Sequence, residues 1–91
     1  MHRLTLKIHG LVQGVGFRWS TRRQASVLNI VGYVKNLSDG TVELVAEGEE
    51  ETLKKLLEYC KIGPQWASVS RLEEKWKDIG KKMFEEFKIV F

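Results

Sequence analysis

The chain has little cysteine and no long apolar run. Cys60 is the only cysteine among 91 residues, so no disulfide can form within the chain and no set of thiolates can hold a zinc ion. No stretch approaches the ~20 apolar residues that span a bilayer. The first residues alternate polar and apolar side chains, whereas a signal peptide would carry an apolar block there. These absences predict a protein of the reducing cytoplasm that does not enter a membrane.

The chain also lacks a large excess of positive or negative charge. The 15 basic and 12 acidic residues are interspersed and leave a net charge of +3, which favours anionic partners only weakly. With 91 residues, of which 43% are hydrophobic, the chain has room for one core and cannot be subdivided. We therefore expect a single domain over residues 1–91.

Hydrophobic periodicity divides the chain into strands and helices. Apolar side chains at every second residue indicate a strand, and apolar side chains three or four residues apart indicate a helix. The predicted elements, in chain order, are a strand over 3–9, a glycine-rich loop over 10–16, a helix over 17–29, strands over 30–37 and 41–47 joined by a Ser38-Asp39-Gly40 turn, a helix that starts at the glutamates 49–51 and is ended by Ile62-Gly63-Pro64, a strand over 67–76, a polar turn or loop over 77–82 and a short strand over 87–91.

This order, βαββαβ with a short fifth strand, predicts an α+β fold. It suggests a ferredoxin-like α/β sandwich, in which an antiparallel sheet carries both helices on one face. The first two strands then run the same way with the third between them, so their C-terminal ends lie about 10 Å apart on one edge. The glycine-rich loop follows the first strand, and Asn36 lies near the end of the second on the same face as Val34. Loop and Asn36 can therefore meet at one site.

The glycine-rich loop predicts an anion-binding site. Glycines let a tight loop turn successive backbone N–H groups inward at a helix N-terminus, and such a nest binds anions. Arg18, in the first helical turn, can grip two phosphate oxygens. A structural turn with an exposed arginine is the alternative. Nucleotide-binding patterns do not fit, because Trp19 replaces the third glycine of G-x-G-x-x-G and no Gly-Lys-Ser/Thr ends the loop.

Two longer motifs extend this interpretation. They are Gly10-x-Val12-Gln13-Gly14-Val15-x-Phe17-Arg18 and Gly32-Tyr33-Val34-Lys35-Asn36-x-x-Asp39-Gly40-x-Val42. The pair resembles both signatures of the acylphosphatase family. The resemblance covers essentially the whole chain, through Glu47-Gly48, Gly63-Pro64, Ala67-x-Val69 and Phe87-x-Ile89. Gln65, where a proline is common, and Phe91, where tyrosine often stands, depart from the family pattern outside both signatures.

The resemblance implies hydrolysis of the carboxyl–phosphate bond of acyl phosphates to a carboxylate and inorganic phosphate. It implies that Asn36 orients the attacking water and that phosphate is bound by Leu11, Val12, Gln13, Gly14, Val15 and Arg18. A departing carboxylate, with a pKa near ~4 to 5, needs no general acid. Positioning and charge stabilisation can then do most of the catalysis. We expect no metal, no cofactor, no nucleic-acid partner and a monomer.

The histidines and tryptophans have plainer interpretations. His2 and His9 lie seven residues apart without carboxylate or cysteine neighbours in the sequence, so we expect them to face solvent. Trp19, Trp66 and Trp76 are scattered over three predicted elements. We expect them to serve in packing or in the wall of the substrate mouth, and not to stack on bases.

The remaining candidates concern charge and a thiol. Arg22 and Arg23 are expected on a solvated helix face, with attraction of anionic substrate as the alternative. Cys60 lies in an apolar stripe and is expected to be buried. The last strand should finish at the active-site edge, where the Phe91 carboxylate could pair with Arg18.

Two other classes of protein share this framework. A non-catalytic ferredoxin-like module could bind an anion, a ligand or RNA, but an RNA-recognition domain needs basic and aromatic side chains on its central strands, and residues 41–47 have neither. A detached acylphosphatase-like domain of larger carbamoyl-phosphate-handling maturation proteins would continue into cysteine-rich segments. We expect a chain complete by itself, whose physiological acyl group the sequence leaves open.

Overall fold

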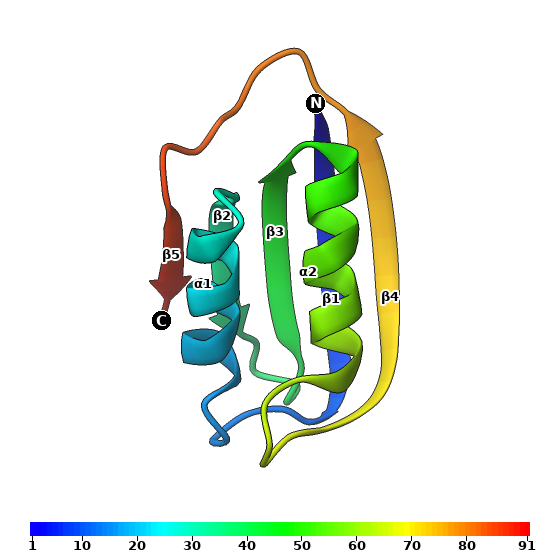
Figure 1. The fold of residues 1–91 in the computed structure, drawn as a ribbon. Coiled ribbons are helices and arrows are strands. Elements are labelled where there is room, and N and C mark those ends of the chain that lie inside the picture. Colours follow the sequence, from blue (N-terminus) through cyan, green and yellow to red (C-terminus); the bar gives the residue numbers. More distant parts are fainter.

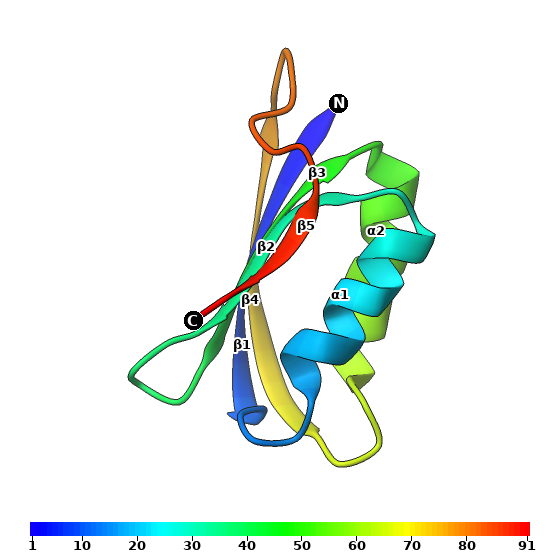
Figure 2. The ribbon, with the colours of Figure 1, turned by 90° about the vertical axis from the view of Figure 1, so that its left-hand side faces the viewer.

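A computed structural model describes all 91 residues. One five-stranded sheet forms a layer whose one face is covered by two helices (Figures 1 and 2). The elements in chain order are β1 (His2–Leu11), α1 (Phe17–Val27), β2 (Val31–Asn36), β3 (Val42–Gly48), α2 (Glu50–Ile62), β4 (Ser68–Asp78) and β5 (Phe87–Val90). The predicted ferredoxin-like α+β fold is confirmed. Neither helix has the length and apolar character needed to cross a membrane.

The strands are ordered β4-β1-β3-β2-β5. The pairs β1–β3, β2–β3 and β1–β4 are antiparallel, so β1 and β2 run the same way on either side of β3, as predicted. The fifth strand corrects the expectation of an antiparallel sheet, because β5 pairs with β2 in parallel, with Val34 opposite Ile89. The chain crosses from β4 at one edge to the free edge of β2 at the other (Figure 1). The sheet is therefore mixed.

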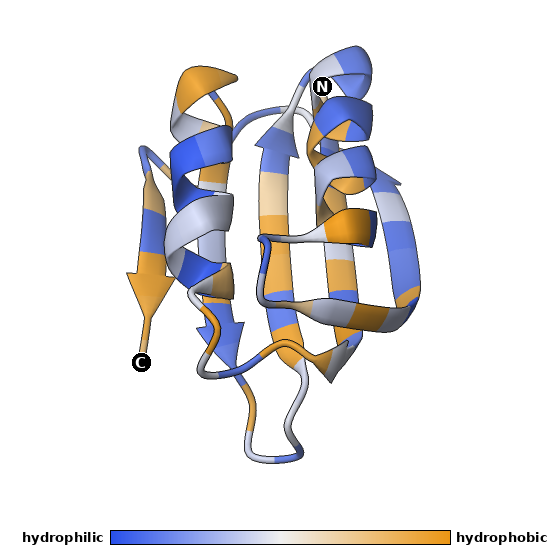
Figure 3. Cartoon of the chain, turned by 60° about the horizontal axis from the view of Figure 1, so that its bottom comes forward, coloured by the Kyte–Doolittle hydropathy of each residue, from blue (hydrophilic) through white to orange (hydrophobic).

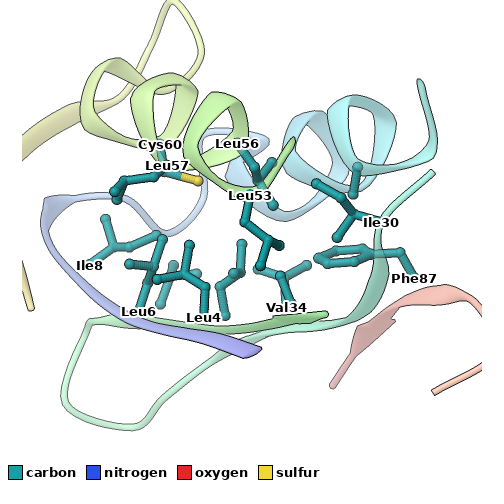
Figure 4. Packing of buried hydrophobic residues seen from close by; sticks show 14 of the residues in the cluster. Leu4, Leu6, Ile8, Ile30, Val34, Leu53, Leu56, Leu57, Cys60 and Phe87 are labelled. Carbon is teal, nitrogen blue, oxygen red and sulfur yellow. The ribbon is translucent and has the colours of Figure 1, made fainter. Parts of the chain in front are cut away.

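The core lies between the sheet and the helices. Leu4, Leu6 and Ile8 of β1 are completely buried, because alternate residues of a strand point to the same face. The apolar stripe of α2, which includes Leu53 and Cys60, packs onto them (Figure 4). Figure 3 shows the same alternation as colour changes along the strands. Each buried aliphatic side chain contributes about 1.5–3 kcal/mol, so this layer fixes how α1 and α2 lie on the sheet.

Several element boundaries differ from the predictions. β4 continues through Asp78, where a polar loop was expected, because its pairing with β1 runs as far as His2. β1 continues to Leu11 after a register shift between His9 and Gly10. The loop after β1 therefore begins at residue 12. Helix α1 ends at Val27, two residues before the predicted end.

A buried carboxylate holds the connection between β4 and β5. Glu47, at 0% exposure, accepts hydrogen bonds from Arg3 Nε at 2.9 Å and Nη2 at 2.7 Å. Its other oxygen accepts from the backbone N–H groups of Met83 at 2.7 Å and Phe84 at 3.3 Å. The two bonds from Met83 and Phe84 tie the connection to β3, and the two from Arg3 join β3 to β1, all on the side of the sheet away from the helices. The position of β5 therefore depends on Glu47.

Candidate active site

The loop between β1 and α1 presents unused backbone donors. Its glycines Gly14 and Gly16 have φ angles of 74° and 78°, a left-handed region that other residues enter only with strain. None of the backbone N–H groups of residues 12–16 donates a hydrogen bond within the protein. Gly16 is the N-cap of α1, and no side chain caps this helix. Free N–H groups and the positive end of a helix dipole together attract an anion.

A cavity of about 160 Å³ lies beside this loop. It brings together residues from the loop, α1, the end of β2 and the end of the chain. The lining residues are Val12, Gly14, Gly16, Phe17, Arg18, Trp19, Asn36, Ile89 and Phe91. Of the residues predicted for the site, Val12, Gly14, Arg18 and Asn36 line the cavity. No acidic side chain does.

Arg18 enters the cavity without a carboxylate partner. Its Nη1 donates to the Val90 carbonyl oxygen at 3.5 Å, and its Cζ lies 4.7 Å from the centre of the Phe91 ring. The contact with the end of the chain is thus made with the Phe91 ring, whereas the sequence had left open an ion pair with the Phe91 carboxylate. Since the long bond to Val90 is the only hydrogen bond that the guanidinium makes, most of its donors remain free for a ligand.

Asn36 contributes an unused acceptor to the same cavity. Its side-chain Oδ1 is buried and has no hydrogen-bond partner in the protein. A buried polar atom without any partner costs about 1–3 kcal/mol, so we expect a ligand or a water in the cavity to satisfy this oxygen. The cavity therefore places a positive guanidinium and an unpaired carbonyl oxygen beside the loop.

Three other predicted residues do not line the cavity. The amide Nε2 of Gln13 donates to the carbonyl oxygens of Leu37 at 2.7 Å and Thr41 at 2.9 Å. It thereby ties the loop to the β2–β3 connection, just beyond Asn36. Leu11 ends β1 with an exposed side chain, and Val15 packs against the core. Nothing in the sequence predicts these two hydrogen bonds of Gln13, because its partners are backbone atoms distant along the chain.

The two histidines are partly exposed, and each also has a carboxylate contact that the sequence did not predict. His2 and His9 side chains are 26% and 21% exposed, and each meets a carboxylate across strands. His2 Nε2 lies 2.7 Å from Asp78, and His9 Nε2 lies 2.6 Å from Glu73, whose pKa is lowered mainly by this hydrogen bond. His2 also lines a hollow of about 570 Å³ between α2 and β4, whose other lining residues are mostly charged. No group of three or more ligating side chains is arranged to hold a metal ion.

The other candidates are divided between the core and the surface. Cys60 is fully buried as predicted, and burial raises the pKa of its thiol to about 12. Arg22 and Arg23 are exposed on α1, and neither forms an ion pair. Trp66 is 73% exposed, and Trp76 is half-buried in the hollow beside β4. Among the tryptophans, Trp19 alone lines the cavity with Arg18 and Asn36.

Known proteins similar to this chain include acylphosphatases in sequence and in structure. The acylphosphatase family pattern matches residues 4–89. The chain is 48% identical over 88 residues to an acylphosphatase of Thermococcus kodakarensis, covering 97% of this chain and 94% of that one. It is 48% identical over 84 residues to an acylphosphatase of Caldanaerobacter subterraneus subsp. tengcongensis, covering 92% of each. The crystal structure of acylphosphatase from Bacillus subtilis has a TM-score of 0.94 at 33% identity, over 100% of both chains.

An α+β sandwich of this strand order, with a glycine-rich loop at one end of its sheet, defines the class of small ferredoxin-like domains. Within that class, the chain belongs to the acylphosphatase family. It is accordingly a hydrolase whose substrates are acyl phosphates and whose product is inorganic phosphate.

Proposed function

We propose that the cavity beside the loop is the site of acyl phosphate hydrolysis, with the phosphate held by the loop and Arg18 and the attacking water oriented by Asn36. One observation carries the proposal. One cavity brings together three unused groups: the backbone N–H groups of the loop, the Arg18 guanidinium without a carboxylate partner, and the buried Asn36 Oδ1 without a hydrogen-bond partner. A phosphate and a water would satisfy all three. Neither a metal nor a cofactor takes part in the steps that follow.

The phosphate-binding step uses charge and geometry together. The backbone N–H groups of residues 12–16 can donate to phosphate oxygens, and the planar guanidinium of Arg18 can hold two of them. Helix α1 carries three of the 15 basic residues and none of the 12 acidic ones. The other 12 basic residues balance the acidic residues, so the net charge of +3 resides on this helix. A dianionic substrate is thereby drawn to the loop.

The chemical step needs little beyond positioning. The Asn36 carbonyl oxygen accepts a hydrogen bond from water and aims its lone pair at phosphorus, but an amide cannot remove the proton. As the water oxygen bonds to phosphorus, the bond from phosphorus to the acyl oxygen breaks and the carboxylate leaves unprotonated. The proton passes to a phosphate oxygen. Arg18 and the loop N–H groups stabilise the charge on the transferring phosphoryl group.

Two substitutions separate these roles in an ultraviolet assay of benzoyl phosphate hydrolysis with a chelator present. Asn36→Ala should lower kcat by roughly 100- to 1,000-fold while inorganic phosphate still inhibits near its original concentration. Arg18→Ala should abolish turnover and also sharply weaken phosphate inhibition. Arg71→Ala, which removes an exposed arginine of β4 that does not line the cavity, is the matched control.

The outcomes of this assay are distinct. Substantial activity in both Arg18→Ala and Asn36→Ala would show that the site assignment is wrong. Loss of activity on chelation would point to a metal enzyme instead.

We further propose that residues 1–91 act as one monomeric domain in the cytoplasm. A single sheet and a single hydrophobic cluster support one domain. A lone thiol held in the core suits a reducing compartment, because it has no partner for a disulfide. Sedimentation equilibrium of the purified chain tests the monomer directly.

A further inference from the structure

Two aromatic side chains at the cavity are unusually exposed. Trp19 is 60% exposed and Phe91 is 90% exposed, although large aromatic residues are usually buried for most of their surface. Neither belongs to the hydrophobic cluster or packs against it. Their exposure is therefore not explained by the core, yet both line the cavity that holds Arg18 and Asn36.

Each ring is in contact with a guanidinium. The Arg18 Cζ lies 4.7 Å from the centre of the Phe91 ring, and the Arg23 Cζ lies 5.6 Å from the centre of the Trp19 ring. Both distances fall within the range of a cation–π interaction. Such contacts hold one face of each ring and leave the rest of its surface accessible. The rings are thus held at the cavity by the arginines of α1.

A third apolar residue connects the rings to the sheet. Ile89 of β5 is partly buried, packs against the core and lines the same cavity. Because α1 and β5 lie side by side (Figure 1), Trp19 from the helix and Ile89 and Phe91 from the end of the chain reach one place. We call Trp19, Ile89 and Phe91 the apolar lip.

We propose that the apolar lip binds the acyl group of the substrate and makes the enzyme prefer acyl phosphates with extended, uncharged apolar acyl groups over short ones. This inference rests on the proposed function. With the phosphate on the loop and Arg18, and the water on Asn36, the polar groups of the cavity are occupied. No acidic side chain and no basic side chain other than Arg18 lines the cavity, so the surface that remains for the acyl group is the apolar lip.

The size of the preference follows from the surface covered. Complete burial of one methylene gives roughly a fourfold gain. The lip is open to solvent on one side and can cover about half of each added methylene. We therefore expect kcat/KM to rise about twofold per methylene, until the acyl chain extends past the rings.

A series of acetyl, butanoyl and hexanoyl phosphates tests the inference by release of inorganic phosphate. The carboxylic acids of the three leaving groups have nearly the same pKa, so the intrinsic reactivity of the three substrates is similar. Chain length therefore changes mainly the area of contact with the lip. For the unmodified protein we expect kcat/KM to rise about fourfold from acetyl to butanoyl phosphate. For Trp19→Ala combined with Phe91→Ala the rise should fall below about twofold. Trp66→Ala, which removes another exposed tryptophan that does not line the cavity, should keep the full rise.

Phosphate inhibition is measured for every variant, because Phe91 also touches Arg18. Weaker phosphate binding lowers kcat/KM for all three substrates equally, whereas loss of the lip changes the ratio of kcat/KM values between the substrates. If the unmodified protein hydrolyses none of the three substrates, both the proposed function and the inference about the apolar lip are refuted. If it hydrolyses them regardless of chain length, or if the double variant keeps the full rise, the lip alone is refuted.

Discussion

Glu47 offers the sharpest test of how this fold is held together. Replacing it with glutamine keeps the shape of the side chain but removes its charge. The Arg3 guanidinium, only 20% exposed, then has no anion beside it. Glu47 accepts all four of its hydrogen bonds. The amide NH₂ group of a glutamine would therefore face N–H donors and could not accept hydrogen bonds from them.

The expected loss of stability is large for a protein of this size. Removing one partner of a buried ion pair costs about 3–5 kcal/mol. A chain of 91 residues typically has an unfolding free energy of about 5–14 kcal/mol. Glu47→Gln should therefore lose a substantial fraction of the total, and Tm should fall by about 12 °C or more.

Urea unfolding followed by circular dichroism measures the loss. Glu58→Gln is the matched control, because Glu58 pairs with Lys61 on the open surface of α2 and its removal should change little. The double variant Arg3→Met with Glu47→Leu leaves no unpaired charge and should recover part of the loss. A destabilisation of less than about 1 kcal/mol for Glu47→Gln, or a double variant no more stable than the single one, would refute the reasoning.

Two further predictions concern the loops around the cavity. Gln13→Glu should lower kcat about tenfold or more, because a carboxylate would face the carbonyl oxygens of Leu37 and Thr41 and displace the glycine-rich loop. An unchanged kcat would contradict this role. The Thr41 hydroxyl and backbone N–H, with a smaller contribution from Lys7, hold the pKa of Asp39 below its usual range. A carboxylate whose pKa is lowered by folding stabilises the folded state at pH values above its pKa in the unfolded chain, near ~4, and this stabilisation is lost as the pH falls. The stability difference between the unmodified protein and Asp39→Asn should therefore shrink between about pH 6 and pH 2. Thermal melts across this range would contradict the assignment if the difference stayed constant.

The sequence predicts most elements of the fold because their signals are local. The alternation in β1 and the stripe in α2 each come from residues close together in the chain. The parallel pairing of β5 has no such signal, since it depends on a connection that Glu47 holds from a distant strand. The length of β4 has none either, because its last residues are polar and become a strand only by pairing with β1.

The same distinction applies to the candidate site. The loop and Arg18 were predicted from residue types, Asn36 was singled out by the family resemblance, and the order of strands predicted that they would meet; residues of all three line one cavity. The contacts of His2 and His9 were not predicted, because their carboxylate partners come from β4 through strand register. The ring of Phe91 over Arg18 depends on where β5 joins the sheet.

The parallel pairing of β5 has a practical consequence for work with this protein. It carries the last residue of the chain to the cavity, where Phe91 touches Arg18. An affinity tag or fusion partner joined after Phe91 would leave the sheet beside that guanidinium and crowd the route to the glycine-rich loop. Residues added before Met1 would instead leave from the end of β1 farthest from that loop (Figure 1).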